Sequence, residues 1–339
     1  MITDVHAHCF PPRYGVMAAE LGLSVRQYAP AEGSHGRPAA YAAPPEDISK
    51  RISAMDEAGV ERQILSHIVA PYLEDRKKAI AAASLLNDEL KAFCANYPDR
   101  LSFWAALPLP HVDAAIEEMK RVLDDPGAVG VTLQCFCLGK SIAVPEFDSL
   151  YAELDRRAAV VLLHPCQNAI GSAFIGDWGL TACLGASVED SVAAAHLIIR
   201  EIPTRFPRIR FIVPHFGGIL PMLLQRLDGQ LPFQLTEKPS ITARRFFYDT
   251  VGWGSRAALA AAHMAFGAER LVPGSDWPVL LQHESYATTF DHIRESDLLS
   301  DADKRLILHH NVQQLLDKHT APEGRQPPDQ GGAGRAPGT

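Results

Sequence analysis

Short apolar or β-branched runs alternate with longer amphipathic segments along most of the chain. A short run of this kind is typical of a buried strand, whereas apolar residues repeating every three to four positions are typical of a helix on a core. Eight strands are predicted in this way, at residues 2–8, 62–68, 101–108, 128–135, 159–165, 208–215, 245–251 and 270–276. Helices are predicted between most of them, at residues 45–60, 73–98, 111–125, 147–158, 187–207, 218–229 and 255–267.

The alternation of strands and helices predicts βα units and a parallel sheet. Eight such units favour an α/β fold of the closed (β/α)8 type, the TIM barrel. A doubly wound sheet is the alternative, but it usually carries a glycine-rich turn after its first strand. Here the first strand runs into HAHCFPP instead. We therefore predict a single barrel domain over residues 1–319.

Two segments do not follow the repeating pattern. Residues 22–45 form a long irregular insertion after the first strand, and long loops in compact domains are usually functional or mobile. We interpret this insertion either as a lid over a site or as a plain surface excursion. Residues 320–339 are dominated by Pro, Gly, Ala and polar residues. They lack the side chains needed to bury a core, so a disordered tail is expected.

The bulk composition excludes several classes of partner. The 339 residues are 47% hydrophobic, with a net charge of −8 and no basic block, which argues against nucleic acid as a partner. No apolar run is judged long enough to span a bilayer, and the start MITDVHAH lacks the pattern of a signal peptide. The six cysteines show no CxxC spacing, so reduced thiols are expected. We therefore expect a cytoplasmic protein without a membrane partner.

Metal-ligating or basic side chains end four of the predicted strands. His6 and His8 end the first, His164 the fifth, His215 the sixth and Asp276 the eighth. The carboxyl ends of barrel strands form the rim that carries the chemistry, and residues i and i+2 of a strand share a face. A His-x-His pair means little in a chain with 14 histidines. Five such residues at strand ends do indicate a site.

These residue types indicate a bound divalent cation. Neutral imidazoles and a carboxylate suit Zn²⁺, with Mn²⁺ as the alternative, and a position left open by the protein marks a catalytic site. Binuclear sites often need a bridging Lys or Glu at the end of strand four, but that strand reads GVTLQC. We predict one metal ion and no organic cofactor. A structural metal site in a binding protein is the non-enzymatic alternative, although such sites normally take all four ligands from the protein.

Five short motifs, taken in order, resemble the amidohydrolase superfamily: DVHAH, RISAMDEAGV, LLHP, PHFGG and GSDWP. Within it, they resemble the branch of α-amino-β-carboxymuconate-ε-semialdehyde decarboxylase, which includes the decarboxylases of γ-resorcylate, 5-carboxyvanillate and 6-methylsalicylate. The resemblance runs from His6 to the region of Asp317. The chain departs from the family where GSDWP replaces the commoner GTDYP, and where HPCQN follows the fifth strand.

The resemblance implies a role for each residue at the strand ends. His6, His8, His164 and Asp276 would bind the metal, and His215 would be a catalytic histidine beside them. It favours non-oxidative decarboxylation of an aromatic or conjugated carboxylic acid with an ortho hydroxyl group. Asp276, or His215 working with it, would then protonate the carbon that bears the carboxylate.

A second reaction is open for the same ligand set. A hydrolase or hydratase would act on a lactone, an amide or an activated double bond through a metal-bound water. The motifs serve both reactions equally well. Release of CO2 from a candidate acid separates the two.

The resemblance also implies three contacts to a small carboxylic acid substrate. Arg51 would grip the substrate carboxylate, Trp178 would form an aromatic wall, and Arg226 would reach into the site of a neighbouring subunit. The last of these implies a homodimer. The residues alone allow plainer readings, namely a solvated helix charge for Arg51, loop packing for Trp178 and a helix-dipole contact for Arg226.

Four further residues lie near the same predicted rim. His67 and Gln134 also end strands and are candidates to touch a substrate, although a hydrogen-bonded rim residue is the plainer reading for each. Cys135 and Cys137 share a strand face. We interpret both as small buried apolar residues rather than as ligands.

Overall fold

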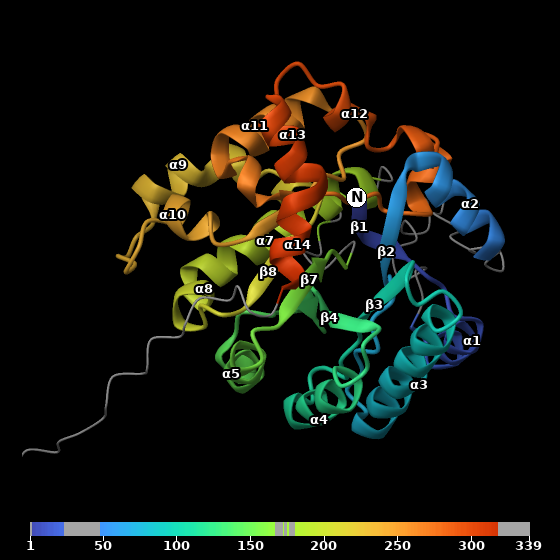
Figure 1. Ribbon diagram of the computed structural model, residues 1–339. Helices are drawn as coiled ribbons and strands as arrows, with labels where there is room; N and C mark the ends of the chain where they lie inside the picture. Colours follow the sequence, from blue (N-terminus) through green and yellow to red (C-terminus); the bar gives the residue numbers. More distant parts are fainter. Residues whose placement is uncertain (1, 24–47, 167–171, 173–174, 176–179, 318–339) are drawn as a thin grey trace, which may run out of the picture.

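The computed structural model describes residues 2–23, 48–166, 172, 175 and 180–317 (Figure 1). Strands occupy the middle of this part of the chain, and helices surround them. Most of the insertion at 22–45, the tail at 320–339 and Trp178 lie outside the described residues, so what the sequence predicts for them stays a prediction.

Eight parallel strands form the barrel that the sequence predicts. They follow one another in chain order around one sheet, each hydrogen-bonded to the next. Every strand overlaps the range predicted for it. The strands are β1 Ile2–His8, β2 Val60–Ser66, β3 Leu101–Ala105, β4 Ala128–Gln134, β7 Val160–His164, β8 Arg210–Val213, β9 Phe247–Asp249 and β10 Leu271–Val272. A small antiparallel hairpin, β5 Phe136–Cys137 and β6 Lys140–Ser141, follows β4.

The barrel closes where the chain after β10 runs beside β1. Ala7 and Trp277 form a parallel bridge, and the backbone N–H of Asp276 donates to the carbonyl of His6 at 2.7 Å. We call this contact the seam of the barrel. It holds the Asp276 segment against the carboxyl end of β1.

Side chains alternate along each strand, so the sheet packs a layer on either face. The inner layer fills the barrel with Val5, Ile64, Trp104, Val160, Leu162, Ile212, Phe247 and Val272. Helix α14 (Asn311–Leu316) adds Val312 and Leu315 to this inner layer, which includes the first residues of β7 and β9. Helix α14 therefore covers the amino-terminal end of the barrel, opposite the rim of histidines.

The outer layer packs against the surrounding helices (Figure 1). Their starts follow capping rules: Asp75 accepts from the N–H of Lys78 before α3, and Ser255 caps α11 in the same way. The helices other than α14 are α1 Pro12–Glu20, α2 Ile48–Ala58, α3 Arg76–Cys94, α4 Val112–Val122, α5 Asp148–Arg156, α7 Ala186–Ile199, α8 Ile202–Arg205, α9 Leu220–Gln230, α10 Pro239–Ala243, α11 Arg256–Phe266, α12 Asp291–Arg294 and α13 Asp301–Arg305.

The helix predicted at 187–207 differs from the observed one. It is broken into α7 and α8 because Glu201 takes a left-handed conformation with φ of 53°, ahead of Pro203, which has no N–H to donate. Helical residues Thr181–Ile199 also pass a length and hydropathy test for a membrane span, contrary to our reading of the sequence. Half of that segment is buried inside the protein, however, and the core helix of a globular barrel passes the same test.

Candidate metal centre and active site

Three histidines and one aspartate converge at the carboxyl rim of the barrel. His6 and His8 end β1, His164 ends β7, and Asp276 follows β10 across the seam. All four are buried, and their ligand atoms lie within 4.8 Å of one another. Among the residues that the structure describes, this is the group of three or more His, Cys, Asp or Glu side chains suited to hold a metal ion.

The shortest distances in the group join nitrogen and oxygen atoms that each carry a lone pair and repel one another. Nε2 of His6 lies 3.2 Å from Nε2 of His8, and Oδ1 of Asp276 lies 2.9 Å from Nε2 of His8 and 3.6 Å from Nε2 of His6. Two ligands of one tetrahedral Zn²⁺, each at about 2.1 Å, lie about 3.4 Å apart. The separations therefore match a shared cation, whose charge would offset the repulsion between these atoms.

A bulge in β1 aims His6 into the barrel. Asp4 pairs with Gln63 of β2, but Ala7 pairs with Leu65, so β1 carries one extra residue over this stretch. Bulges of this kind redirect side chains next to active sites. The side chain of Val5 can thus fill the barrel core while His6, the next residue, also reaches the metal centre.

Each of the three histidines uses its other ring nitrogen to contact a hydrogen-bond acceptor. Nδ1 of His6 lies 2.7 Å from Oδ2 of Asp249, Nδ1 of His8 lies 2.9 Å from Oγ of Ser66, and Nδ1 of His164 lies 3.0 Å from the carbonyl of Pro165. A proton on Nδ1 leaves the Nε2 lone pair for a metal. The donor set therefore fits a divalent cation.

Burial favours neutral imidazoles at two of these positions. It is the largest influence on the pKa of His8 and of His164, and it lowers both well below the usual value for histidine. Burial would also lower the pKa of His6, but the carboxylates of Asp249 and Asp276 outweigh it and raise that pKa. Neutral imidazoles are the form that binds metal ions.

His215 stands beside the four ligands. It follows β8 after Pro214, its ring centroid is 5.5 Å from that of His6, and 18% of its side chain is exposed. Its Nδ1 is 2.8 Å from Oδ2 of Asp190, and its backbone N–H donates to Oδ1 of Asp249 at 2.8 Å. Burial would lower the pKa of His215, but Asp190 outweighs it and raises that pKa to about 9. His215 is thus placed to handle a proton.

Comparison with known proteins agrees with this architecture. The family model described as Amidohydrolase matches residues 3–318. The chain belongs to the amidohydrolase family. This amidohydrolase is 31% identical over 249 residues to gamma-resorcylate decarboxylase of Rhizobium sp. (strain MTP-10005), covering 67% of this chain and 76% of that protein. It is 27% identical over 331 residues to 6-methylsalicylic acid decarboxylase of Penicillium expansum, covering 93% and 98%.

Solved structures show the same fold. One is the dihydroxybenzoic acid decarboxylase from Polaromonas sp. JS666, solved with bound manganese and the inhibitor 2-nitroresorcinol. It superposes on this amidohydrolase with a TM-score of 0.74 at 22% identity, over 93% of this chain and 97% of that one. The fold predicted from the eight strands is therefore confirmed.

The structure places the predicted substrate residues of this amidohydrolase in different surroundings. Arg51 is buried, and its Nη atoms donate to Oε1 of Gln63 and to the carbonyl of His8, both at 2.7 Å. Its guanidinium also lies 5.3 Å from the ring centroid of Trp277. These contacts place Arg51 behind the metal ligands, and a contact with a substrate carboxylate stays a prediction. Arg226 is exposed on α9, the helix that follows His215 in the chain, and a contact with a neighbouring subunit stays a prediction.

The other residues predicted near the rim, Gln134, His67, Cys135 and Cys137, are all buried. Gln134 donates to the carbonyl of Ile68 at 2.7 Å, so it is a hydrogen-bonded rim residue. His67 differs from Gln134, because its Nδ1 is buried and has no hydrogen-bond partner among the described residues. Cys135 and Cys137 are buried small side chains, and burial raises the pKa of the Cys137 thiol to about 12.

Two buried carboxylates of the site were not singled out from the sequence. Asp249 ends β9 and contacts both His6 and His215, so the strand-end argument used for the histidines applies to it as well. Asp190 lies next to Glu189 in the otherwise apolar helix α7, where this pair of acids gives no periodic signal. Its position next to His215 follows only from the packing of α7 against the turn after β8.

Proposed function

We propose that this amidohydrolase is a metal-dependent, non-oxidative decarboxylase of an aromatic or conjugated carboxylic acid with an ortho hydroxyl group. The observation that carries the proposal is the group of three imidazoles and one carboxylate at the rim. The group lies in a chain whose similarity to a decarboxylase extends over 93% of its length. The three relatives described above are all named as decarboxylases.

The four converging side chains would hold one divalent cation, with Zn²⁺ as the first candidate and Mn²⁺ as the second. Imidazole nitrogens and carboxylate oxygens are both zinc ligands, whereas the Polaromonas structure contains manganese. When bound, the cation would supply positive charge against the negative charge that develops on the substrate. The reaction requires no organic cofactor.

Two side chains at the rim are placed to handle the proton. Nε2 of His215 forms no hydrogen bond with a described residue, and 11% of the Asp276 side chain is exposed. Asp276, or His215 working with it, gives a proton to the carbon that bears the carboxylate. The bond between this carbon and the carboxylate then breaks, CO2 leaves, and the electron pair of that bond restores the conjugated system.

The first experiment combines metal content with a test of turnover. We expect about one equivalent of Zn or Mn per chain by elemental mass spectrometry, lost in His6→Ala. The loaded protein should release CO2 from a hydroxybenzoic or muconic acid in a panel of such acids, while Asp276→Asn should not. Hydrolysis or hydration of a substrate without CO2 release would replace the proposal with the alternative reaction, and an active Asp276→Asn protein would remove that residue from both.

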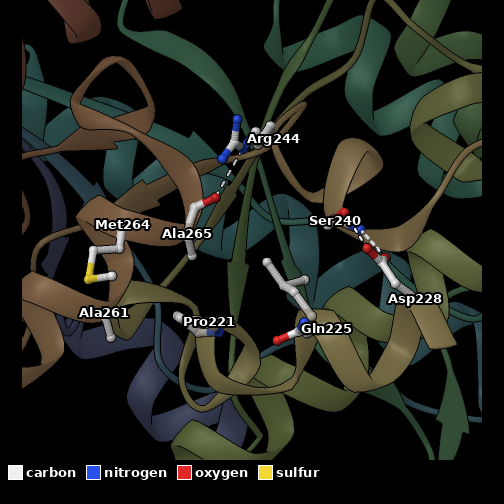
Figure 2. Close-up of a pocket in the computed structure, with 9 residues that line it drawn as sticks. Pro221, Gln225, Asp228, Ser240, Arg244, Ala261, Met264 and Ala265 are labelled. Carbon is white, nitrogen blue, oxygen red and sulfur yellow. Dashed lines mark hydrogen bonds between the residues drawn. The ribbon is translucent and has the colours of Figure 1, made fainter. Parts of the chain in front are cut away.

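We further propose a homodimer that joins through helices α9, α10 and α11. Apolar side chains on this face are unusually exposed, which is typical of an interaction surface: Ile219 38%, Met222 76%, Ile241 54% and Met264 81%. Met264 also lines a groove of about 420 Å³ between the three helices (Figure 2). Arg226 is exposed on the same helix as Met222 and is not hydrogen-bonded or ion-paired to a described residue, which leaves it available to a neighbouring subunit.

Mixed dimers test whether Arg226 acts on the neighbouring site. Arg226→Ala and Asp276→Asn should each be inactive alone. After the two are unfolded and refolded together, half of the random dimers are mixed, and one site in each mixed dimer regains both residues. Activity should then return to about a quarter of the wild-type value. No recovery in a preparation shown to contain mixed dimers would argue that Arg226 plays no part in the neighbouring site.

We also propose a cytoplasmic location. All six cysteines are free thiols, including the partly exposed Cys166 and the exposed Cys183. Free thiols persist in reducing compartments. Fractionation of cells that express the full chain, followed by thiol labelling, tests this directly.

A further inference from the structure

A buried carboxylate on α7 faces His215. Asp190 is fully buried, and its Oδ2 lies 2.8 Å from Nδ1 of His215. Its Oδ1 accepts from the thiol of Cys135 at 3.6 Å. A buried carboxylate is costly unless it is paired and hydrogen-bonded. Of these two described partners, His215 can carry a charge opposite to that of Asp190 at neutral pH, and Cys135 cannot.

The opposite edge of the His215 ring faces the site. Nε2 makes no hydrogen bond with a described residue, and the ring lies beside His6 at the edge of the ligand group. In an imidazole, the atom that Nδ1 contacts decides which nitrogen carries the proton. An acceptor at Nδ1 keeps a proton there. What Nε2 presents to a substrate therefore depends on Asp190.

The backbone at His215 adopts a strained conformation that contacts from outside the turn must stabilise. His215 and Phe216 both have positive φ, 53° and 55°, a region that costs free energy for residues other than glycine. Helix α7 stabilises the segment after His215, because Oγ of Ser191, the residue next to Asp190, accepts from the N–H of Ile219 at 2.8 Å. Two consecutive residues of α7 thus contact this segment through their side chains. Ser191 binds the backbone N–H of Ile219, and Asp190 binds the ring of His215.

We propose that Asp190 is a positioning residue for His215. Its carboxylate fixes the ring orientation and keeps a proton on Nδ1, so that Nε2 faces the substrate. Asp190 itself touches no substrate and acts only through the histidine. The inference rests on the proposed decarboxylase function, in which His215 takes part in the proton transfer.

The kinetic test compares two variants of the full-length, zinc-loaded protein. In Asp190→Ala, Nδ1 loses its acceptor, and kcat should fall about 100- to 1,000-fold with KM and zinc content unchanged. In Asp190→Asn an amide oxygen still accepts from Nδ1, so the loss should be only about tenfold. Glu118→Gln is the matched control. It replaces a buried carboxylate on α4 that accepts from Asn87, and it should keep kcat within about twofold.

The second readout needs no substrate. At a pH at which His215 is neutral, nitrogen shifts of ¹⁵N-labelled histidines should show its proton on Nδ1 in the wild type and in Asp190→Asn. The His215 signals are assigned through their loss in His215→Gln. In Asp190→Ala the population should move to the proton on Nε2. Unchanged nitrogen shifts or an unchanged kcat in Asp190→Ala would overturn the proposal. If Asp190→Ala does not fold, a wild-type kcat in Asp190→Asn would also overturn the proposal.

The two readouts separate this inference from the proposed function. If the wild type decarboxylates none of the acids tested, the proposed function fails. The nitrogen shifts still decide whether Asp190 sets the state of His215.

Discussion

Asp249 contacts three parts of the site at once. Its Oδ2 lies 2.7 Å from Nδ1 of His6, and its Oδ1 accepts from the backbone N–H of His215 at 2.8 Å and of Val251 at 3.1 Å. A carboxylate that accepts from a metal-ligating imidazole fixes the ring and increases its basicity. At the scale of single residues, the ligands are therefore held in place by the side chains behind them.

The variant Asp249→Asn should weaken metal binding without removing a ligand. Loss of the charge behind His6 should lower metal affinity about 10- to 100-fold, measured by competition with a chelator at fixed pH. Asp113→Asn is the control, because Asp113 is an exposed carboxylate paired with Arg76 on the outside of the barrel. Equal affinities in the two variants would show that Asp249 does not support His6.

The sequence identified the residues whose chemistry is distinctive and which end a strand. His6, His8 and His164 meet both conditions, whereas Asp276 follows β10 beyond its end. The structure brings all four together. The pairing of His215 with Asp190 could not be predicted, because it depends on how a helix packs on a turn. No residue pattern within either segment encodes that contact.

The turn between β8 and α9 is held tightly against helix α7. A Cβ on Gly218 would lie 2.1 Å from the carbonyl of Ser187, and Gly218 has a φ of +61°. Only glycine meets both demands without strain. At the scale of elements, this close approach positions the turn that carries His215.

The substitution Gly218→Ala should therefore destabilise the protein by about 2–4 kcal/mol and lower turnover. Urea unfolding and kcat measure the two effects. Gly229→Ala on α9 is the comparison, because a Cβ there meets no atom within 4 Å. It should be neutral or stabilise by up to about 1 kcal/mol. Equal unfolding midpoints for the two variants would contradict the close packing described.

Helix α5 carries a carboxylate that makes stability depend on acidity. Hydrogen bonds from Arg156 first, and from Arg157, lower the pKa of Glu153 from 4.5 to about 2. A carboxyl whose pKa is depressed on folding stabilises the fold above its unfolded pKa. That contribution is lost as the pH falls from about 4.5 through about 2.

Glu153→Gln should then cost about 1 kcal/mol at pH 7, since the exposure of Arg156 limits the strength of the pair. The difference from the wild type should shrink towards zero near pH 2, as followed by urea unfolding at each pH. A difference that stays constant between these pH values would assign the effect to helix propensity rather than to charge.

All eight strands were located by their apolar runs because burial on both faces imposes such runs in a parallel barrel. The bulge in β1 was not predicted, since inserting one residue into the pairing leaves the apolar pattern intact. The break after α7 was also missed. Pro203 was visible, but the left-handed turn at Glu201 depends on local backbone geometry.

The whole molecule separates stability from chemistry along the barrel axis. The rim carries the metal centre, while α14 inserts Val312 and Leu315 into the barrel core from the other end. Residues at the amino-terminal end of such a barrel serve the fold, whereas those at the carboxyl rim serve the reaction.

Truncation of Leu315 to Ala should destabilise the protein by about 2–4 kcal/mol, because the fully buried side chain leaves a cavity. Metal content and kcat at a temperature well below the unfolding transition should remain at wild-type values. Leu316→Ala, at a partly buried position on the same helix, should cost less. A fall in metal content in Leu315→Ala would show that the two ends of the barrel are coupled.

The position of Asp276 at the seam determines when during synthesis the metal ligands can come together. Two ligands lie on the first strand and one just after the last, so a chain still being synthesised lacks Asp276 until nearly every βα unit exists. Early capture of a cation by His6 and His8 alone would be weak, because affinity grows with the number of ligands fixed in place. A cation would thus bind tightly only to chains that have closed the barrel. The fraction of chains that carry the metal in a cell would then report the fraction that has completed folding.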